Sequence, residues 1–436
     1  MRNKEFLKGA VWIAGGAFIS KLIGALYRIP LTNLIGGYGT GLYQMIYPFY
    51  CLLLTVSATG IPSSISAITA RELAKGDKAR GVLASALKLF IVIGLLGSVV
   101  MVLLAKPLSN AQGESSLAGG YIALAPAVAL VSVISVFRGW FQGNGNMRPT
   151  AISEILEQVV KVGVGLLFAY LYRGDIKKSV TALLFAVTLS ELFALFYMLL
   201  KYKRVHAPTL LKNDRGRVAM KEILKTSVFV TLASALLPLS NMLESVFLVR
   251  LMNGYTGNAI SLYGLFAGGA VTLVNLPVSL CYGVVAITIP TLARAQRAER
   301  KKKLFYSLGL TLLVSLPCAI GLYFFAPTIV DLLYRSLSVM EKQTLVSLIK
   351  NFSISAVTLS GLQTLSGSLT AQDKPRLSAI TMSLGIAVKL GLDFLLVSRP
   401  EYSIFGAVIS ANVCYALVFI LNLIANLFLT RKKKSA

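Results

Sequence analysis

The chain has 436 residues, of which 56% are hydrophobic and 14% are charged, and its mean hydropathy is +0.74. A soluble protein of this length needs far more polar surface, so the composition excludes a soluble globular protein and indicates a chain that faces lipid or other buried helices. The net charge is +26, from 43 Lys and Arg against 17 Asp and Glu. In a soluble protein that excess would suggest nucleic-acid binding. Here the cations gather between apolar blocks, a pattern that sets membrane topology, so we expect no nucleic-acid partner.

Apolar stretches long enough to cross a bilayer, at ~20 residues each, follow one another along the chain. They lie at 10–34, 42–68, 83–105, 119–137, 151–172, 179–200, 226–250, 262–290, 304–326, 344–370, 377–397 and 404–429. The sequence therefore predicts an all-α polytopic membrane protein with about 12 transmembrane helices. The first apolar run continues past Lys21 without a small-x-small cleavage site, so we expect an uncleaved first helix.

The connections between the predicted helices alternate in charge. Basic connections lie at 71–80, 138–148, 201–225, 294–303 and 372–376, and both termini are basic as well. The intervening turns are poorer in Lys and Arg. Because basic connections stay on the cytoplasmic side of a membrane, the sequence predicts a multi-pass cell-membrane protein with cytoplasmic N- and C-termini.

Two stretches of the second half repeat stretches of the first half. AISEILEQVVKVGVGLL (151–167) matches AITMSLGIAVKLGLDFL (379–395) at an offset of 228 residues. ITARELAKGDKAR (68–80) resembles TLARAQRAERKKK (291–303) at an offset of 223 residues. An offset near half the chain predicts two six-helix lobes, related by a pseudo-two-fold axis along the membrane normal.

This duplication predicts the domain organisation. We expect an N-terminal lobe at 1–200, a cytoplasmic linker at 201–225 and a C-terminal lobe at 226–436. A duplicated helical bundle is typical of secondary transporters, whose substrate site lies between the repeats near mid-membrane. No G-x-x-x-x-G-K-[ST] phosphate loop is present, which excludes ATP hydrolysis by that route.

Side chains suited to metal or hydrolytic chemistry are sparse. The four cysteines stand singly in apolar segments without CxxC spacing, and the one histidine, His206, lies in a predicted cytoplasmic loop. A membrane-embedded glycan polymerase or phosphatase needs clustered acids or histidines, often in a large external loop, and the outer connections here are short. We therefore expect no enzyme activity, no catalytic residues, no metal and no cofactor. We also expect a monomer.

The first predicted helix carries two cations, Lys21 and Arg28. They are seven residues apart, so they share one face and stand about 10 Å apart along the axis, with Gly24 between them. A charge in the hydrocarbon region is costly unless it faces protein or a water-filled interior. Snorkelling or pairing with a carboxylate would be a structural explanation, but Lys21 lies near mid-membrane. We therefore predict that this pair binds an anion, and ammonium and guanidinium groups suit phosphate.

Two further lysines lie within predicted helices. Lys161 and Lys389 are candidates for substrate binding. Each also has a carboxylate four residues away, Glu157 before Lys161 and Asp393 after Lys389. Residues four apart on a helix are neighbours, so these pairs could instead neutralise each other.

Other polar residues in the predicted helices are acidic or amide side chains. Glu154 and Glu191 lie within the fifth and sixth spans. Glu244 lies in the seventh span with Asn241 one turn before it. Glu244 suits cation coupling and a structural pair equally well.

About the first 80 residues carry a family likeness. The stretch KLIGALYRIPLTNLIGGYGTGLYQMIYPFYCLLLTVSATGIPSSIS (21–66) contains an R-x-x-x-x-N-L-I-G-x-x-G-x-G-L-Y-Q run and a G-I-P, and RELAKGDKARG follows. These features resemble the stage V sporulation protein B group of polysaccharide-biosynthesis transporters. More distantly, the chain is similar to the lipid II flippases of the MurJ type and to the multidrug and toxin extruders, all of one superfamily.

The resemblance implies a function. It implies that an undecaprenyl-diphosphate-linked saccharide, such as a peptidoglycan or polysaccharide precursor, is moved from the inner to the outer leaflet of a bacterial cell membrane by alternating access. The expected partners are this lipid-linked saccharide and membrane lipids, in cell-wall growth, capsule formation or sporulation. The S-R-x-x-G-x-x-R pattern of the flippases is matched by Ser20, Lys21, Gly24 and, one place later, Arg28. Many members of the group carry about fourteen helices, whereas this sequence predicts twelve.

The resemblance also bears on coupling and gating, for which the candidates are Glu157, Asn241, Glu244 and Asp393. A sodium site of the kind proposed for some flippases needs acidic and amide groups in spans seven and eleven, where Asn241, Glu244 and Asp393 lie. Lys389, one turn before Asp393, would repel a cation, which argues against sodium coupling, and the membrane potential could power the cycle without a coupling ion. The alternative is a proton- or sodium-coupled multidrug antiporter, against which a cationic cavity between the lobes would argue.

Overall fold

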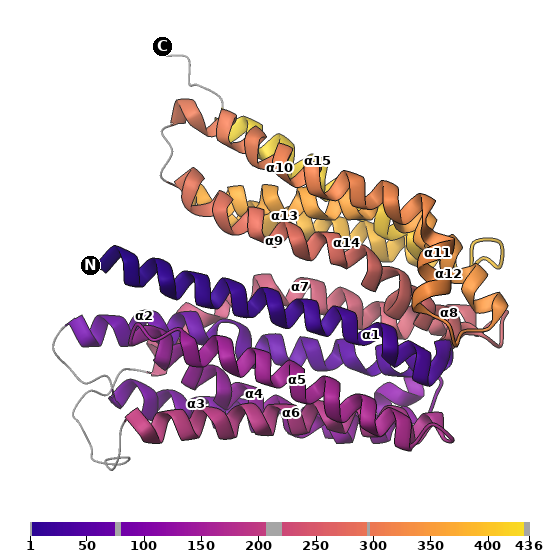
Figure 1. Cartoon of the computed structure of the whole chain (residues 1–436), viewed down its shortest axis with the longest axis horizontal. Coiled ribbons are helices and arrows are strands. Elements are labelled where there is room, and N and C mark those ends of the chain that lie inside the picture. Colours follow the sequence, from indigo (N-terminus) through magenta and orange to yellow (C-terminus); the bar gives the residue numbers. More distant parts are fainter. Residues whose placement is uncertain (1, 75–79, 206–219, 294–296, 431–436) are drawn as a thin grey trace. The chain divides into compact units, whose positions relative to one another are not determined.

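The computed structural model describes residues 2–74, 80–205, 220–293 and 297–430. These residues are helical almost throughout and include no β-strand (Figure 1). A helix satisfies its own backbone N–H and C=O groups, which lipid cannot do, so an apolar chain of this kind folds into helices. The predicted all-α fold is confirmed.

The helices have the following bounds in chain order. The first half contains α1 (Arg2–Leu54), the π-helical turn η1 (Thr55–Thr59), α2 (Ile61–Ala74), α3 (Arg80–Ala111), α4 (Leu117–Gly143), α5 (Arg148–Leu171), α6 (Ile176–Val205) and α7 (Met220–Met252). The second half contains α8 (Ala259–Gly264), the π-helical turn η2 (Leu265–Ala270), α9 (Val271–Ala293), α10 (Arg297–Phe324), α11 (Ala326–Leu333), α12 (Val339–Phe352), α13 (Ser355–Ala371), α14 (Pro375–Val397) and α15 (Ile404–Thr430).

The helices account for the number of spans expected. Within the described ranges, nine helices are long and apolar enough to cross a membrane, or ten if the bent pair α12 and α13 forms one span. One of the nine is the run Phe18–Ala74, whose 57 residues are enough for two crossings of a ~30 Å hydrocarbon core. Helix α5 is long enough at 24 residues but carries several charged side chains. With that run taken as two spans and α5 as one, the described helices provide the twelve spans predicted.

The chain forms two compact units, which divide helix α1 between them. The first unit comprises Met1–Gly24 and Met45–Ser245, and the second comprises Ala25–Gln44 and Val246–Ala436. The middle of α1 therefore belongs with the C-terminal helices, although it lies near the N-terminus in sequence. The lobe boundaries derived from the sequence stay a prediction, and residues 206–219 of the predicted linker lie outside the described residues.

The two units contain the same packing pattern. In the first unit α6 packs on α4 and α5, and α4 packs on α2 and α3. In the second unit α15 packs on α13 and α14, and α13 packs on α9 and α10. A π-helical turn precedes α2 in one unit and α9 in the other. The correspondence of α5 with α14 agrees with the sequence match between 151–167 and 379–395.

Helix α1 bends at Gly36, where φ is 69° and ψ is −176°. Side-chain-bearing residues are strained in this conformation, so glycine is required here. Next to the bend, the backbone N–H of Gly37 donates to Glu341 Oε1 at 3.2 Å, and Asn33 Nδ2 donates to the carbonyl of Leu333 at 2.6 Å. These bonds attach the bent part of α1 to α12 and to the end of α11 within the second unit.

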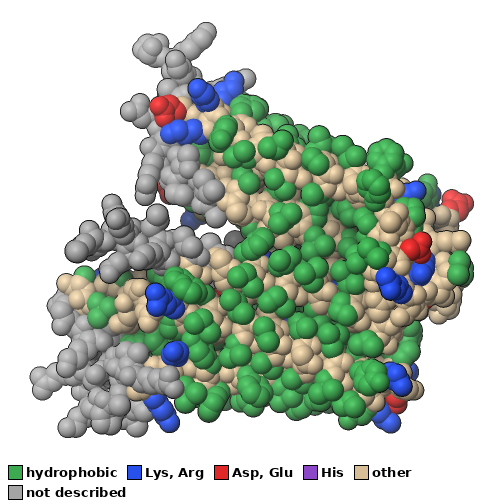
Figure 2. All heavy atoms as spheres, viewed as in Figure 1, with side chains coloured by type: hydrophobic (Ala, Val, Ile, Leu, Met, Phe, Trp, Pro, Cys, Tyr) green, Lys and Arg blue, Asp and Glu red, His purple; other side chains and the backbone are tan. Residues whose placement is uncertain are grey.

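The surface of the protein suits a lipid environment. Figure 2 shows hydrophobic side chains over the long sides of the helices, with Lys and Arg toward the helix ends. Large apolar side chains such as Leu103, Phe196 and Leu313 are 61–71% exposed. Apolar exposure of this extent is unfavourable in water but expected where the helices meet acyl chains.

Candidate functional site

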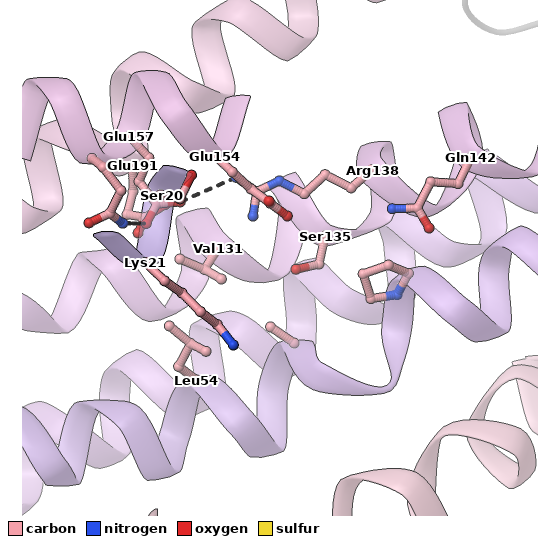
Figure 3. Close-up of a pocket in the computed structure, with 13 residues that line it drawn as sticks. Ser20, Lys21, Leu54, Val131, Ser135, Arg138, Gln142, Glu154, Glu157 and Glu191 are labelled. Carbon is pink, nitrogen blue, oxygen red and sulfur yellow. Dashed lines mark hydrogen bonds and ion pairs between the residues drawn. The ribbon is translucent and has the colours of Figure 1, made fainter. Parts of the chain in front are cut away.

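A pocket with a volume of about 430 Å³ lies within the first unit (Figure 3). Residues of α1, η1, α2, α4, α5 and α6 enclose it. Its lining residues are Ser20, Lys21, Leu54, Ala58, Pro62, Val131, Ser135, Arg138, Gln142, Glu154, Glu157, Gln158 and Glu191. Two cations and three carboxylates are therefore collected within one membrane-spanning bundle. This pocket is of mixed charge, unlike the cationic cavity that the sequence predicts, because α5 and α6 bring carboxylates beside the cations.

Arg138 forms an ion pair with Glu157 in this pocket. Its Nη2 atom lies 3.2 Å from Glu157 Oε2, and its Nε–H donates to Ser153 Oγ at 2.9 Å. The Arg138 and Glu157 side chains are only 12% and 18% exposed. Shielding from water strengthens the attraction relative to a surface pair, and it also makes either charge costly to leave alone. Glu157 is thus bound to Arg138 of α4, a partner that the helical spacing to Lys161 did not suggest.

Arg138 and Gln142 line the pocket, although the sequence predicts that both lie in a connection between helices. The sequence assigns them to a basic cytoplasmic connection at 138–148, but α4 continues to Gly143 and holds both side chains in the pocket. The spacing of Ser135, Arg138 and Gln142, three and then four residues apart, was an available signal. Residues at that spacing share one helix face, and all three line the pocket.

Lys21 and Gly24 lie on the part of α1 that faces α5. The side chain of Lys21 is exposed and lines the pocket, where Lys21 and Arg138 both attract the carboxylate of Glu154. A Cβ atom at Gly24 would stand 3.0 Å from Gln158 Oε1, so the end of the Gln158 side chain of α5 lies against this glycine. The structure therefore places one predicted anion-binding cation, Lys21, at a pocket.

Glu191 lies deepest among the pocket carboxylates. Its side chain comes from α6, is 2% exposed and accepts a hydrogen bond from the Tyr50 hydroxyl at 3.4 Å. Its other oxygen, Oε2, has no hydrogen-bond partner among the residues described. Lys161, buried on α5, and Arg138 both attract Glu191. The sequence shows Glu191 within a span but gives no sign that it reaches the same pocket as Lys21.

Arg28 belongs to the second unit and does not line this pocket. Its Nη1 atom donates to Thr272 Oγ1 at 3.1 Å, on helix α9. The side chain of Arg28 is half-buried, and the fully buried Tyr334 lies within its electrostatic reach. Lys21 and Arg28 share one helix, but their described contacts lie in different units.

The remaining candidates are not among the residues that line the pocket. Lys389 and Asp393 are 5% and 2% exposed on α14, and Glu244 is buried on α7, where Ser240 donates to it at 3.0 Å. The Asn241 side chain is exposed. In the described part of the chain, no group of three or more His, Cys, Asp or Glu side chains could hold a metal ion. The roles proposed for these residues stay predictions.

The sequence is similar to a family of membrane proteins and to individual members. The polysaccharide biosynthesis protein family matches residues 6–296. The chain is 25% identical over 440 residues to Stage V sporulation protein B of Bacillus subtilis (strain 168), a match that covers 97% of this chain and 83% of that protein. It is 23% identical over 449 residues to the Lipid II flippase MurJ of the same organism, with coverages of 95% and 81%.

The fold is also similar to that of a solved structure. The inward-facing conformation of a multidrug resistance MATE family transporter of the MOP superfamily matches with a TM-score of 0.78 and 15% identity, covering 95% of this chain and 96% of that one. At this identity the match shows a common fold alone. The family match extends over well more than half of the chain and confirms the resemblance seen in its opening residues. The chain is a polytopic membrane protein that belongs to the polysaccharide biosynthesis protein family.

Proposed function

We propose that the protein is a flippase that moves an undecaprenyl-diphosphate-linked saccharide from the inner to the outer leaflet of the bacterial cell membrane. The observation that carries this proposal is the placement of Lys21 and Arg138 at one pocket inside a bundle of membrane-spanning helices. Family membership and the likeness to the Lipid II flippase MurJ support a lipid-linked saccharide as the substrate class.

The two cations suit a diphosphate because they offer different kinds of contact. The guanidinium of Arg138 has five donors in a planar fork, and Lys21 adds a mobile ammonium group. Charge-assisted hydrogen bonds to phosphate are strong where little water competes. While the pocket is empty, the ion pair with Glu157 keeps the Arg138 guanidinium in a fixed position. A bound headgroup would compete with Glu157 for this guanidinium. Arg28, with its single described hydrogen bond to Thr272, is a further candidate for binding the headgroup.

The membrane potential can power this transport. Moving a negative headgroup outward across an inside-negative membrane is favourable by ~2.3 kcal/mol per charge per 100 mV. Transport of this kind requires no ATP and no enzymatic step.

The proposal is tested by measuring flipping of defined lipids in liposomes. Purified protein is reconstituted with a fluorescent undecaprenyl-diphosphate-linked disaccharide, and the fraction reaching the opposite leaflet is followed with and without an imposed potential. We expect flipping that accelerates when the potential drives negative charge across, and at least a tenfold loss in Lys21→Gln and Arg138→Gln. Equal flipping by empty liposomes and by protein-containing ones would overturn the proposal.

A coupled multidrug antiporter is the second candidate. It is favoured by the carboxylates of Glu154, Glu157 and Glu191 in the pocket, which would attract a cationic drug, and by the common fold with a multidrug transporter. Expression in a host that lacks its own drug pumps distinguishes the two functions. An antiporter would raise resistance to cationic drugs, and Glu191→Gln would abolish that resistance. A flippase would leave resistance unchanged.

A further inference from the structure

Glu191 is a buried carboxyl group, and none of the ion pairs described above includes it. It is 2% exposed and lines the pocket from α6. One oxygen accepts a long hydrogen bond of 3.4 Å from Tyr50, and the other, Oε2, is buried without a hydrogen-bond partner among the described residues. A buried polar atom without a hydrogen bond is uncommon in native structures, and it often marks a functional group.

Titratable groups face Glu191 from three of the helices around it. Tyr50 comes from α1, Arg138 from α4, and both Glu157 and Lys161 come from α5. Arg138 is already engaged by Glu157 at 3.2 Å, and Glu157 itself repels a second negative charge nearby. Loss of water around an ionised carboxylate is unfavourable unless hydrogen bonds replace it. Glu157 is therefore paired with Arg138, whereas one oxygen of Glu191 has no hydrogen-bond donor among the described residues.

We propose that Glu191 takes up a proton when the anionic headgroup occupies the pocket and releases it when the headgroup leaves. This inference rests on the proposed function and adds proton uptake to it. The headgroup brings two negative charges to Lys21 and Arg138, close to Glu191, and like charges at short range favour the neutral carboxyl. The proton comes from water, forms one O–H bond at the carboxylate, and returns to water on the side where the headgroup is released. Because linkage is reciprocal, protonation of Glu191 must strengthen headgroup binding by the same factor.

The test is the pH dependence of headgroup binding to the full-length protein in lipid nanodiscs. The probe is an undecaprenyl-diphosphate-linked monosaccharide, because both of its phosphates are esterified and lack the proton that a terminal phosphate loses near pH ~6. Calorimetry in two buffers of different ionisation enthalpy counts the protons taken up on binding. We expect uptake of up to one proton, with an affinity that rises as the pH falls, by at most about tenfold per pH unit.

Three variants test whether Glu191 is the group that takes up the proton. Glu191→Gln imitates the protonated carboxyl, so it should bind the probe at pH ~8 about as tightly as the wild type binds it in acid, with no proton uptake. Tyr50→Phe removes only the hydrogen bond and should keep proton uptake. Glu114→Gln is the matched control. Glu114 does not line the pocket, and its carboxylate lies 3.0 Å from the ammonium group of Lys177, so this substitution should leave the pH dependence unchanged.

The outcomes separate this inference from the function on which it rests. Probe binding without proton uptake in the wild type overturns the role of Glu191 and leaves the flippase proposal standing, and this measurement needs no variant to fold. An unchanged pH dependence in Glu191→Gln does the same. Absence of probe binding at every pH contradicts the proposed function itself, and the inference fails with it.

Discussion

The guanidinium of Arg138 and the carboxylate of Glu157 lie 3.2 Å apart and connect α4 to α5 at the wall of the pocket. The pair has two consequences. It stabilises the packing of two helices that are otherwise joined by a short turn, and it keeps a guanidinium at the pocket in a defined position. Removing either partner therefore affects both stability and binding, and the two effects need separate measurements.

A double-mutant cycle measures the ion pair. Arg138→Gln leaves Glu157 without its partner, and Glu157→Gln leaves Arg138 likewise. Since both side chains are more than four-fifths shielded, we expect each single change to lower the free energy of unfolding by about 2 kcal/mol, between the values typical of surface and buried pairs. The double variant should recover at least half of the summed loss. Thermal unfolding in detergent provides the measurement, and additive losses would show that the two charges do not interact.

Lys21→Gln should remove binding without removing stability. The Lys21 side chain is exposed at the pocket, so little buried surface is lost when glutamine replaces it. We expect at least a tenfold loss of flipping in liposomes with an unfolding midpoint within a few degrees of the wild type. Lys178→Gln is the control, because the Lys178 side chain is 74% exposed and pairs with Asp175 in a connecting segment. Equal flipping by wild type and Lys21→Gln would show that this lysine is not part of the anion site.

Substitutions of Arg28 and Thr272 test whether Arg28 binds the headgroup or only stabilises the second unit. Thr272→Val removes the acceptor of the 3.1 Å hydrogen bond but keeps the Arg28 charge. If Arg28 binds the headgroup, Thr272→Val should keep most of the flipping activity and lose about 1 kcal/mol of stability, whereas Arg28→Gln should lose flipping at least tenfold. Flipping and unfolding are measured on the same preparations. Equal losses of flipping in both variants would instead mean that the hydrogen bond, and not the charge, is what transport needs.

Two glycines of different backbone conformation test the bend in α1. A Cβ atom would meet nothing within 4 Å at either Gly36 or Gly163. Gly36 has a φ of 69°, whereas Gly163 lies inside the regular helix α5. We expect Gly36→Ala to lower the free energy of unfolding by about 1–3 kcal/mol through backbone strain, and Gly163→Ala to leave it unchanged or raise it by up to about 1 kcal/mol. A similar effect of both changes on thermal unfolding would contradict the requirement for glycine at the bend.

The sequence indicates which charged residues are unusual in an apolar helix, but it does not show which distant helix supplies their partners. Lys21 was recognisable because a lysine among apolar residues is costly wherever the helix goes. The sequence places Arg138 in a basic connection because it begins the segment 138–148, although its spacing from Ser135 and Gln142 is that of one face of a helix, and α4 continues to Gly143. The pairing of Glu157 was sought at Lys161, four residues away, while the structure supplies Arg138 from another helix.

The sequence by itself determined that this protein is a bundle of membrane-spanning helices with an internal repeat. That information is local or periodic: apolar runs of bilayer length, basic connections between them and two matching stretches at nearly equal offsets. Only the tertiary structure decided that Lys21, Arg138, Glu157 and Glu191 line one pocket, and that the middle of α1 belongs with the C-terminal helices. Which faces of different helices meet depends on packing between residues far apart in the chain, and an apolar helix carries little in its own sequence that specifies its partner.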